Sequence, residues 1–306
     1  MTVIVAEYLG VRTDTGSPIT PVNVSSRAKI PCPFRNAHCD KAARGNKPVC
    51  SVWDADTREL WIVCSHRLCA TSPKDQPLNE HQKTILHSVA QTIFTPDITR
   101  PDVLVKRETA IPVTEDSSYS ADYVMWRRNP NTTTLTAPDR PVILEMQGGG
   151  ETTATGELTR HIDQWEKLPS PTIEILTQPV KKTAPLVTNA WRRQQEQFLV
   201  KGNVAMMTGG KMVFCIGSMI ERYLMPRLRE TIQFRDLRQS NWTLALLTFI
   251  EDPSETQRPD CAPHSLALKI DVERSLFTNY SSFVQAITNQ GSPCNSLFAE
   301  PYITLE

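Results

Sequence analysis

The chain has 306 residues, of which 40% are hydrophobic and 22% are charged. This size and mixture are typical of a soluble globular protein and exclude a disordered or fibrous chain. The 33 Lys and Arg residues balance the 33 Asp and Glu residues, so a bound polyanion would have to be held by local basic patches.

No segment reaches the roughly 18 to 20 apolar residues that cross a bilayer, so we expect no membrane partner. The first seven residues meet an acid too soon for a signal peptide and predict a strand instead. We therefore expect a cytoplasmic protein. In that reducing compartment its eight cysteines favour metal binding, catalysis or burial over disulfides.

The remaining elements follow from hydrophobic periodicity and turn residues. A loop-rich segment over residues 31–69 ends in a strand at 60–64. Beyond it the pattern predicts a helix over 79–94, strands at 103–105, 123–126 and 142–144, a helix over 157–168, a strand at 172–177 and a helix over 185–204. The chain continues with a strand at 211–216, a helix over 218–228 whose last turn Pro226 should disturb, strands at 243–250 and 266–272, and a helix over 281–287. This order predicts an α/β fold, a mixed sheet flanked by helices, with an N-terminal region over 1–75 and a core region over 76–306.

Five cysteines lie close together in the N-terminal region. They are Cys32, Cys39, Cys50, Cys64 and Cys69, separated by six, ten, thirteen and four residues. Thiolates gathered in this way can close a tetrahedral zinc or iron site, which would stabilise a module with few core residues. The alternative is a set of buried free thiols. His38 or His66 could replace one sulfur, although a histidine beside cysteines more often lies outside the ligand set.

Carboxylates lie at the ends of two predicted strands, with Asp122 in front of one and Glu145 at the end of the other. Alternate residues of a strand share a face, so Glu145 and Gln147 point into one cleft, and a hairpin would bring Asp122 beside them. Glu108, with thirteen residues between it and Asp122, could add a third carboxylate. Hard oxygen ligands suit Mg²⁺, whose bound water can attack a phosphodiester. The loop over residues 148–150 consists of three glycines, which allow another backbone to come close. The alternative is that these strand-end acids are simply solvated.

Together the two patterns resemble a known family. Cys32-Pro33-Phe34, Cys39 with Lys41, Cys50-Ser51-Val52 and Val63-Cys64-Ser65-His66-Arg67 are similar to the iron-binding cysteine module of NotI-type type II restriction endonucleases. In that family the module precedes a PD-(D/E)XK nuclease core whose last motif residue is glutamine in place of lysine. The resemblance extends from Cys32 to Gln147.

The resemblance implies a role for each of these residues. Glu108, Asp122, Glu145 and Gln147 would be the active site, with Asp122 and Glu145 holding a catalytic Mg²⁺. Cys32, Cys39, Cys50 and Cys64 would hold a structural iron or zinc ion, with Cys69 as an alternative fourth ligand. Gln147 cannot exchange a proton, so it would orient the attacking water and could not be its base.

The same resemblance implies a type II restriction endonuclease, which hydrolyses phosphodiester bonds of double-stranded DNA at a GC-rich palindrome. A palindrome is read by two-fold symmetry, so we expect a homodimer, and a cognate DNA methyltransferase in the same cell. The alternatives are a metal-stabilised DNA-binding regulator without catalysis and a structure-specific repair nuclease.

Basic residues follow the proposed nuclease motif. Lys181, Lys182, Arg192 and Arg193 lie in a segment without acids that also contains Trp191. A second group lies between Arg222 and Arg238. We expect these groups to contact phosphates and guanine edges, whereas a solvated helix face is the alternative.

Overall fold

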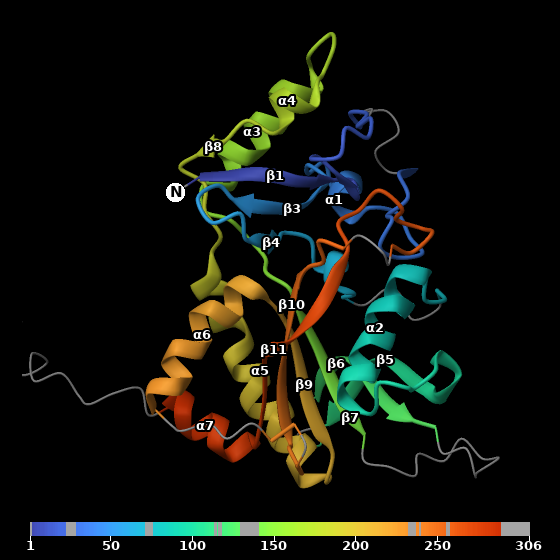
Figure 1. The fold of residues 1–306 in the computed structure, drawn as a ribbon, viewed down its shortest axis with the longest axis vertical. Coiled ribbons are helices and arrows are strands. Elements are labelled where there is room, and N and C mark those ends of the chain that lie inside the picture. Colours follow the sequence, from blue (N-terminus) through green and yellow to red (C-terminus); the bar gives the residue numbers. More distant parts are fainter. Residues whose placement is uncertain are drawn as a thin grey trace, which may run out of the picture.

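The computed structural model describes residues 2–22, 29–70, 76–112, 115, 118–128, 141–231, 237–238, 240–254 and 258–288, apart from the side chains of residues 229–231. It contains two β-sheets with helices packed against them (Figure 1). The larger sheet is mixed and flanked by helices, so the predicted α/β class is confirmed.

The larger sheet has six strands. They are β5 (Val103–Pro112), β6 (Ser118–Arg127), β7 (Val142–Gln147), β9 (Lys211–Gly217), β10 (Leu244–Glu251) and β11 (Leu268–Thr278). Their order across the sheet is β11-β10-β9-β7-β6-β5. β7, β9 and β10 are parallel neighbours, and the other pairs are antiparallel.

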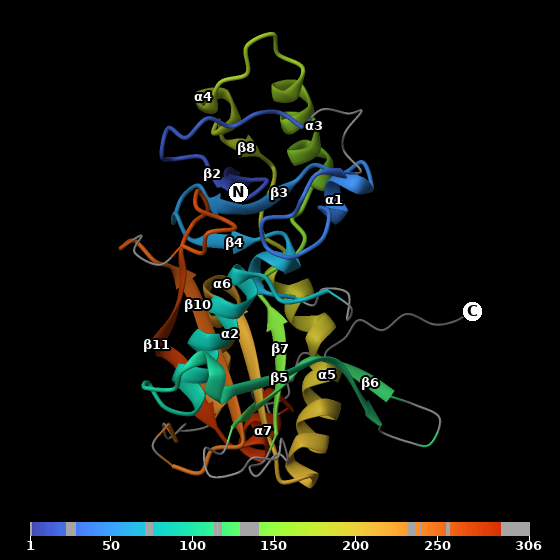
Figure 2. The ribbon, with the colours of Figure 1, turned by 90° about the vertical axis from the view of Figure 1, so that its right-hand side faces the viewer.

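Helices cover both faces of this sheet (Figures 1 and 2). One face is covered by α2 (Glu80–Ile93), and the other by α5 (Val187–Met207), α6 (Ser218–Thr231) and α7 (Tyr280–Thr288). α5 and α6 are also the crossovers that parallel strand pairs require. The predicted 79–94 helix is confirmed as α2, which begins after Asn79. The Asn79 side chain accepts a hydrogen bond from the Gln82 N–H at 3.0 Å, and the Gln82 side chain accepts one from the Asn79 N–H at 3.1 Å.

The smaller sheet contains β1 (Thr2–Tyr8), β2 (Val11–Arg12), β3 (Val49–Asp54), β4 (Leu60–Ile62) and β8 (Val180–Lys181). Two helices pack beside it, α3 (Thr155–Glu166) and α4 (Ile173–Leu176). The Tyr8 hydroxyl donates to Glu166 at 2.6 Å, and the Tyr8 ring meets the Trp165 ring edge-on at 5.1 Å. β8 pairs with β1, so this layer combines the N-terminal region with a segment inserted between β7 and α5.

Two local expectations were wrong. The strand expected at 172–177 is the one-turn helix α4, in which Leu176 is buried and the Thr172 carbonyl accepts from the Trp165 indole at 2.8 Å. The alternating isoleucines suggested a strand, but contacts with α3 determine the conformation here. Pro226 lies inside α6, which continues to Thr231. Proline removes one helical hydrogen bond, and the packing of α6 on the sheet outweighs that loss.

A buried ion pair connects the cysteine-containing segment to both sheets. This segment includes α1 (Asp40–Ala43) and the 3₁₀ turn η2 (Ser65–Leu68), and a second such turn, η3 (Arg100–Asp102), precedes β5. Arg67 of η2 donates to Glu7 of β1 at 2.8 Å, and both side chains are at most 1% exposed. Glu7 also accepts from the Ser51 hydroxyl at 2.6 Å and from the Leu266 N–H at 2.8 Å. Every polar group of this cluster thus has a partner, as burial requires.

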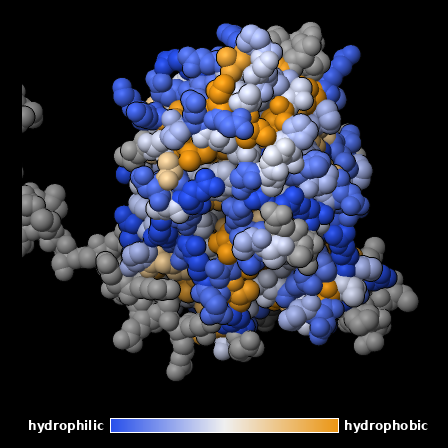
Figure 3. All heavy atoms as spheres, turned by 45° about the horizontal axis from the view of Figure 1, so that its top comes forward, coloured by the Kyte–Doolittle hydropathy of each residue, from blue (hydrophilic) through white to orange (hydrophobic). Residues whose placement is uncertain are grey.

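The face of the molecule toward the smaller sheet is mostly hydrophilic, with apolar residues in small patches (Figure 3). In the part of the chain that the structure describes, no helix is both long and apolar enough to cross a bilayer.

Candidate active site and cysteine cluster

Three carboxylates form one row across adjacent strands. In the β5–β6 pair, Glu108 lies opposite Asp122, between the register partners Arg107↔Tyr123 and Thr109↔Ala121. In the β6–β7 pair, the partners Tyr123↔Leu144 place Asp122 beside Glu145. Residues directly opposite each other on antiparallel strands share a face. The row therefore brings together all three acids expected from the sequence.

Hydrogen bonds fix one oxygen of each of the two inner carboxylates. Asp122 Oδ2 accepts from the Met146 N–H at 2.8 Å. Glu145 Oε1 accepts from Lys201 Nζ at 2.6 Å and from the Asp122 N–H at 3.4 Å. Within the described residues, Asp122 Oδ1 and Glu145 Oε2 have no hydrogen-bond partner. One oxygen of each acid is thus anchored, and the other has no hydrogen-bond partner among the described residues.

Burial strongly affects the ionisation of this row. Burial raises the pKa of Asp122, and the nearby Glu108 carboxylate raises it further. Burial and the negative charge of Asp122 raise the pKa of Glu145 to about 7, although Lys201 acts in the opposite direction. Carboxylates held together in this way are stabilised by a proton or by a bound cation.

Glu108 differs from the two inner acids. Its side chain is half-buried, and its φ of 42° lies in the left-handed region that non-glycine residues seldom adopt. Strained backbone of this kind is concentrated at functional sites.

Lys201 belongs to this site and was missed in the sequence analysis. It lies on α5 with its side chain 2% exposed and contacts the acid row from above the sheet. Its position in the sequence could have indicated this role, because Lys201 lies three residues after Phe198 and four before Ala205. Both of these residues are buried, so Lys201 lies on the buried face of the helix. A lysine on an apolar helix face needs a partner, and here that partner is Glu145.

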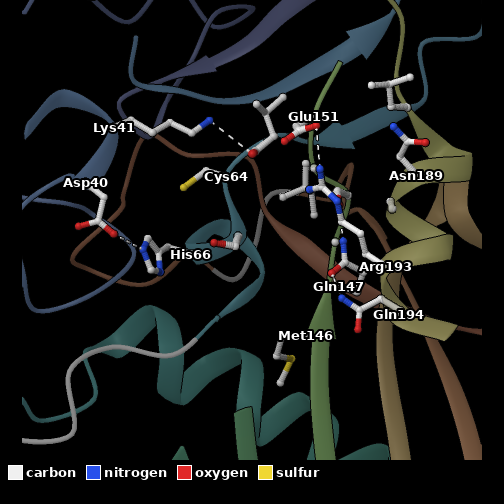
Figure 4. A pocket seen from close by; sticks show the side chains of 18 of the residues that line it. Asp40, Lys41, Cys64, His66, Met146, Gln147, Glu151, Asn189, Arg193 and Gln194 are labelled. Carbon is white, nitrogen blue, oxygen red and sulfur yellow. Dashed lines mark hydrogen bonds and ion pairs between the residues drawn. The ribbon is translucent and has the colours of Figure 1, made fainter. Parts of the chain in front are cut away.

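Gln147 lies at the edge of a cleft of about 430 Å³ between the cysteine-containing segment and the start of α5 (Figure 4). Its Oε1 accepts from the Gln194 side chain at 2.6 Å, and its Nε2 donates to the Gly149 carbonyl. Glu145, two residues earlier on the same face, is buried beneath α5. Gln147 is therefore the member of the expected catalytic set that lines the cleft.

The glycine loop after Gln147 packs against β4. The Gly150 N–H donates to the Ile62 carbonyl at 2.9 Å, and a Cβ atom at Gly149 would lie 2.4 Å from that oxygen. The glycines thus allow a close backbone approach, and the neighbouring backbone belongs to the N-terminal sheet. The contact joins the cysteine-containing segment to the strand that carries Glu145 and Gln147.

Four of the five clustered cysteines gather in the structure. Cys32, Cys39, Cys50 and Cys64 are buried in one small apolar cluster. The thiol of Cys64 is close enough to the other three to raise their pKa values, although burial is the larger cause and raises the pKa of Cys32 to about 12. Backbone N–H groups of Phe34 and of α1 point at the sulfurs of Cys32 and Cys39. These donors favour thiolates.

The fifth thiol and the histidines lie apart from this cluster. Cys69 is buried in a different cluster, with its sulfur 3.5 Å from the Tyr123 hydroxyl. His66 Nε2 lies 3.0 Å from Asp40, and His38 is exposed. Cys294 lies outside the described residues. Cys69, His38 and His66 are therefore not grouped with the four sulfurs.

The donor atoms at both places are of the types expected for the ions predicted from the sequence. Four soft sulfur donors suit zinc or iron. Carboxylate oxygens suit Mg²⁺, which binds one or two acids and keeps several waters. Among the described residues, no group of three or more His, Cys, Asp or Glu side chains is placed to hold a metal ion, either at the four sulfurs or at the acid row.

The predicted DNA-binding residues fall in two places. Lys181 and Lys182 are exposed at β8, beside the smaller sheet, whereas Arg192 and Arg193 are exposed on α5. Arg193 lines the cleft and pairs with Glu151 at 3.0 Å (Figure 4). Trp191 does not join this basic surface, because it is buried against Phe198 and Phe283.

The later basic group is largely engaged within the protein. Arg222 pairs with Glu59 at 2.7 Å, Arg227 stacks on Tyr223, and Arg238 donates to the Val272 carbonyl. Arg235 and the side chain of Arg229 lie outside the described residues.

No protein-family model and no curated protein matches the chain. The assignment of the site therefore rests on its own geometry and on the sequence resemblance.

Proposed function

We propose that the chain is a divalent-metal-dependent endonuclease for double-stranded DNA, built on a PD-(D/E)XK core. The row of Glu108, Asp122 and Glu145 carries this proposal, because two of its acids keep one oxygen without a hydrogen-bond partner among the described residues, and Gln147, two residues after Glu145, lines a cleft. The row lies in a mixed sheet flanked by helices, which is the α/β class that the sequence predicts.

Asp122 and Glu145, with Glu108 in the same row, would hold Mg²⁺. When bound, this ion supplies positive charge to the scissile phosphate and lowers the pKa of a bound water. The residues around it have complementary roles. The Met146 N–H and Lys201 keep the two acids in fixed orientations, while the amide of Gln147 faces the cleft from which DNA and water approach. Gln147 can orient the attacking water through hydrogen bonds but cannot take its proton.

The cysteine cluster has a structural role in this proposal. Cys32, Cys39, Cys50 and Cys64 would bind iron or zinc as thiolates, and the ion would offset the cost of burying four thiols without a larger core. The glycine contact at Ile62 connects β4 to the loop after β7, and the Glu7–Arg67 pair connects the cysteine-containing segment to β1. The metal would therefore hold one wall of the cleft in place.

The sequence resemblance extends the proposal to a type II restriction endonuclease. It supports a GC-rich palindrome as the substrate, a homodimer as the active form and a cognate DNA methyltransferase as a partner in the cell. Arg192 and Arg193, next to the cleft, are the basic residues best placed to contact the DNA backbone, and Lys181 with Lys182 would add a second contact at β8.

Digestion of plasmid DNA tests this function. Purified protein should cut with Mg²⁺ and remain inactive with EDTA, and the products should be discrete fragments. Nicks or smears in place of discrete bands would favour a structure-specific nuclease, and binding without any cutting would favour a regulator.

A further inference from the structure

The buried face of α5 carries a polar stripe toward the active-site end of β7. Gln194, Gln197 and Lys201 are spaced three and four residues apart, so they follow one side of the helix. A helix that covers a sheet normally presents apolar side chains there. Lys201 Nζ accepts no hydrogen bond and donates three, to Glu145 Oε1 at 2.6 Å, to the Ser120 carbonyl at 2.6 Å and to Gln197 Oε1 at 2.7 Å.

The stripe contacts both polar residues at the end of β7. Lys201 binds Glu145, and Gln194 donates to Gln147 at 2.6 Å. The contact with Lys201 occupies Glu145 Oε1 and leaves Oε2 without a hydrogen-bond partner among the described residues. The ammonium also touches the backbone of β6 at Ser120, two residues before Asp122. One side chain thus connects the two strands that carry the inner acids.

Charge compensation alone does not account for this arrangement. A buried ion pair is seldom more stable than an apolar pair of the same volume, and Phe198, Phe214 and Phe283 already stack beside this position. Lys201 lies beside these stacked phenylalanines and is bonded to an acid of the row. This combination indicates a functional role for the lysine.

We propose that Lys201 is a positioning residue of the active site, which holds Glu145 Oε1 so that Oε2 stays directed to the metal and which provides the fixed positive charge that Gln147 lacks. This inference rests on the proposed nuclease function. Lys201 would act through Glu145, since all three of its N–H groups are already donated within the protein.

Lys201→Met tests the role, with Lys47→Met as the matched control. Lys47 is also buried and pairs with Glu166 at 2.6 Å and with Asp163, but both partners lie on α3, away from the acid row. Both variants should melt at a lower temperature than the wild type. For the folded protein, Lys201→Met should lower the single-turnover cleavage rate about 100-fold. Its DNA Kd, measured with Ca²⁺ in place of Mg²⁺, should change less than about threefold, and Lys47→Met should leave both quantities unchanged.

Lys201→Arg supplies the second arm. The guanidinium keeps the positive charge and the hydrogen-bond donors, so Lys201→Arg should cleave DNA at least about tenfold faster than Lys201→Met. The proposal is overturned if Lys201→Met cuts at the wild-type rate, or if Lys201→Arg is no faster than Lys201→Met. A wild-type protein that does not cut overturns the nuclease function itself, which is a distinguishable result.

Discussion

Gly149→Ala should separate the N-terminal sheet from the active-site strand. The new Cβ would lie 2.4 Å from the Ile62 carbonyl oxygen and 3.2 Å from the Ile62 backbone N and C. These are rigid backbone atoms, so the loop must move by about 1 Å to reach an ordinary contact distance. The movement would break the bridge between Ile62 and Gly149, which includes the Gly150 N–H bond to the Ile62 carbonyl. Loss of this buried hydrogen bond at about 1 kcal/mol, plus strain of about 1 to 3 kcal/mol at the close backbone contact, gives a loss of about 2 to 4 kcal/mol.

Denaturant unfolding of Gly149→Ala and Gly156→Ala measures this effect. Gly156 lies in the first turn of α3 with no atom within 4 Å of an added Cβ, so alanine there should stabilise the protein by about 0.5 kcal/mol. Gly149→Ala should also reduce DNA cleavage, because Gln147 lies two residues before the displaced loop. If Gly149→Ala were as stable as the wild type within about 0.5 kcal/mol, the close packing of this loop against β4 would be wrong.

Three further predictions follow from the structure. Cys32→Ser and Cys50→Ser should release a bound metal and lower stability by several kcal/mol. Cys69→Ser, in the other cluster, should keep the metal. Elemental analysis in which Cys69→Ser loses the metal and Cys32→Ser keeps it would show that the proposed ligand set is wrong. Arg192→Ala with Arg193→Ala should flatten the salt dependence of DNA binding by about one unit of slope per lost phosphate contact, and an unchanged slope would place the DNA elsewhere. Burial, reinforced by the positive charge of Arg67, lowers the pKa of His81 to about 3, below the ordinary value of 6.5. The folded state therefore binds fewer protons than the unfolded state, and the free energy of unfolding should fall as the pH drops from about 6.5 toward 3. His81→Gln should weaken this pH dependence, and identical stability curves for both proteins would contradict it.

The acid row could be predicted because it depends on local patterns. Strand alternation places Glu145 and Gln147 on one face, and a hairpin places Asp122 beside them. The register in the structure agrees with that expectation and also brings in Glu108. Grouping of the cysteines followed from their spacing, but only the fold separates Cys69, which its position in the sequence left as an alternative ligand.

Long-range packing could not be predicted in the same way. Lys201 lies 56 residues from Glu145, and nothing in the local sequence connects α5 with β7. Pairing of β8 with β1 joins the first strand of the chain to a segment inserted between β7 and α5, and α4 takes its helical form from contacts with α3. Such contacts depend on tertiary structure, which overrides local propensity.

Paired measurements on Asp122→Asn and Glu145→Gln test whether the carboxylate row performs the proposed metal-dependent cleavage. Both variants remove a carboxylate next to the proposed position of the phosphodiester, so DNA binding without Mg²⁺ should be equal to or tighter than that of the wild type. Plasmid cleavage with Mg²⁺ should be abolished in both, because each loses a metal ligand. Cleavage by either variant at the wild-type rate would place the active site elsewhere and contradict the proposed function.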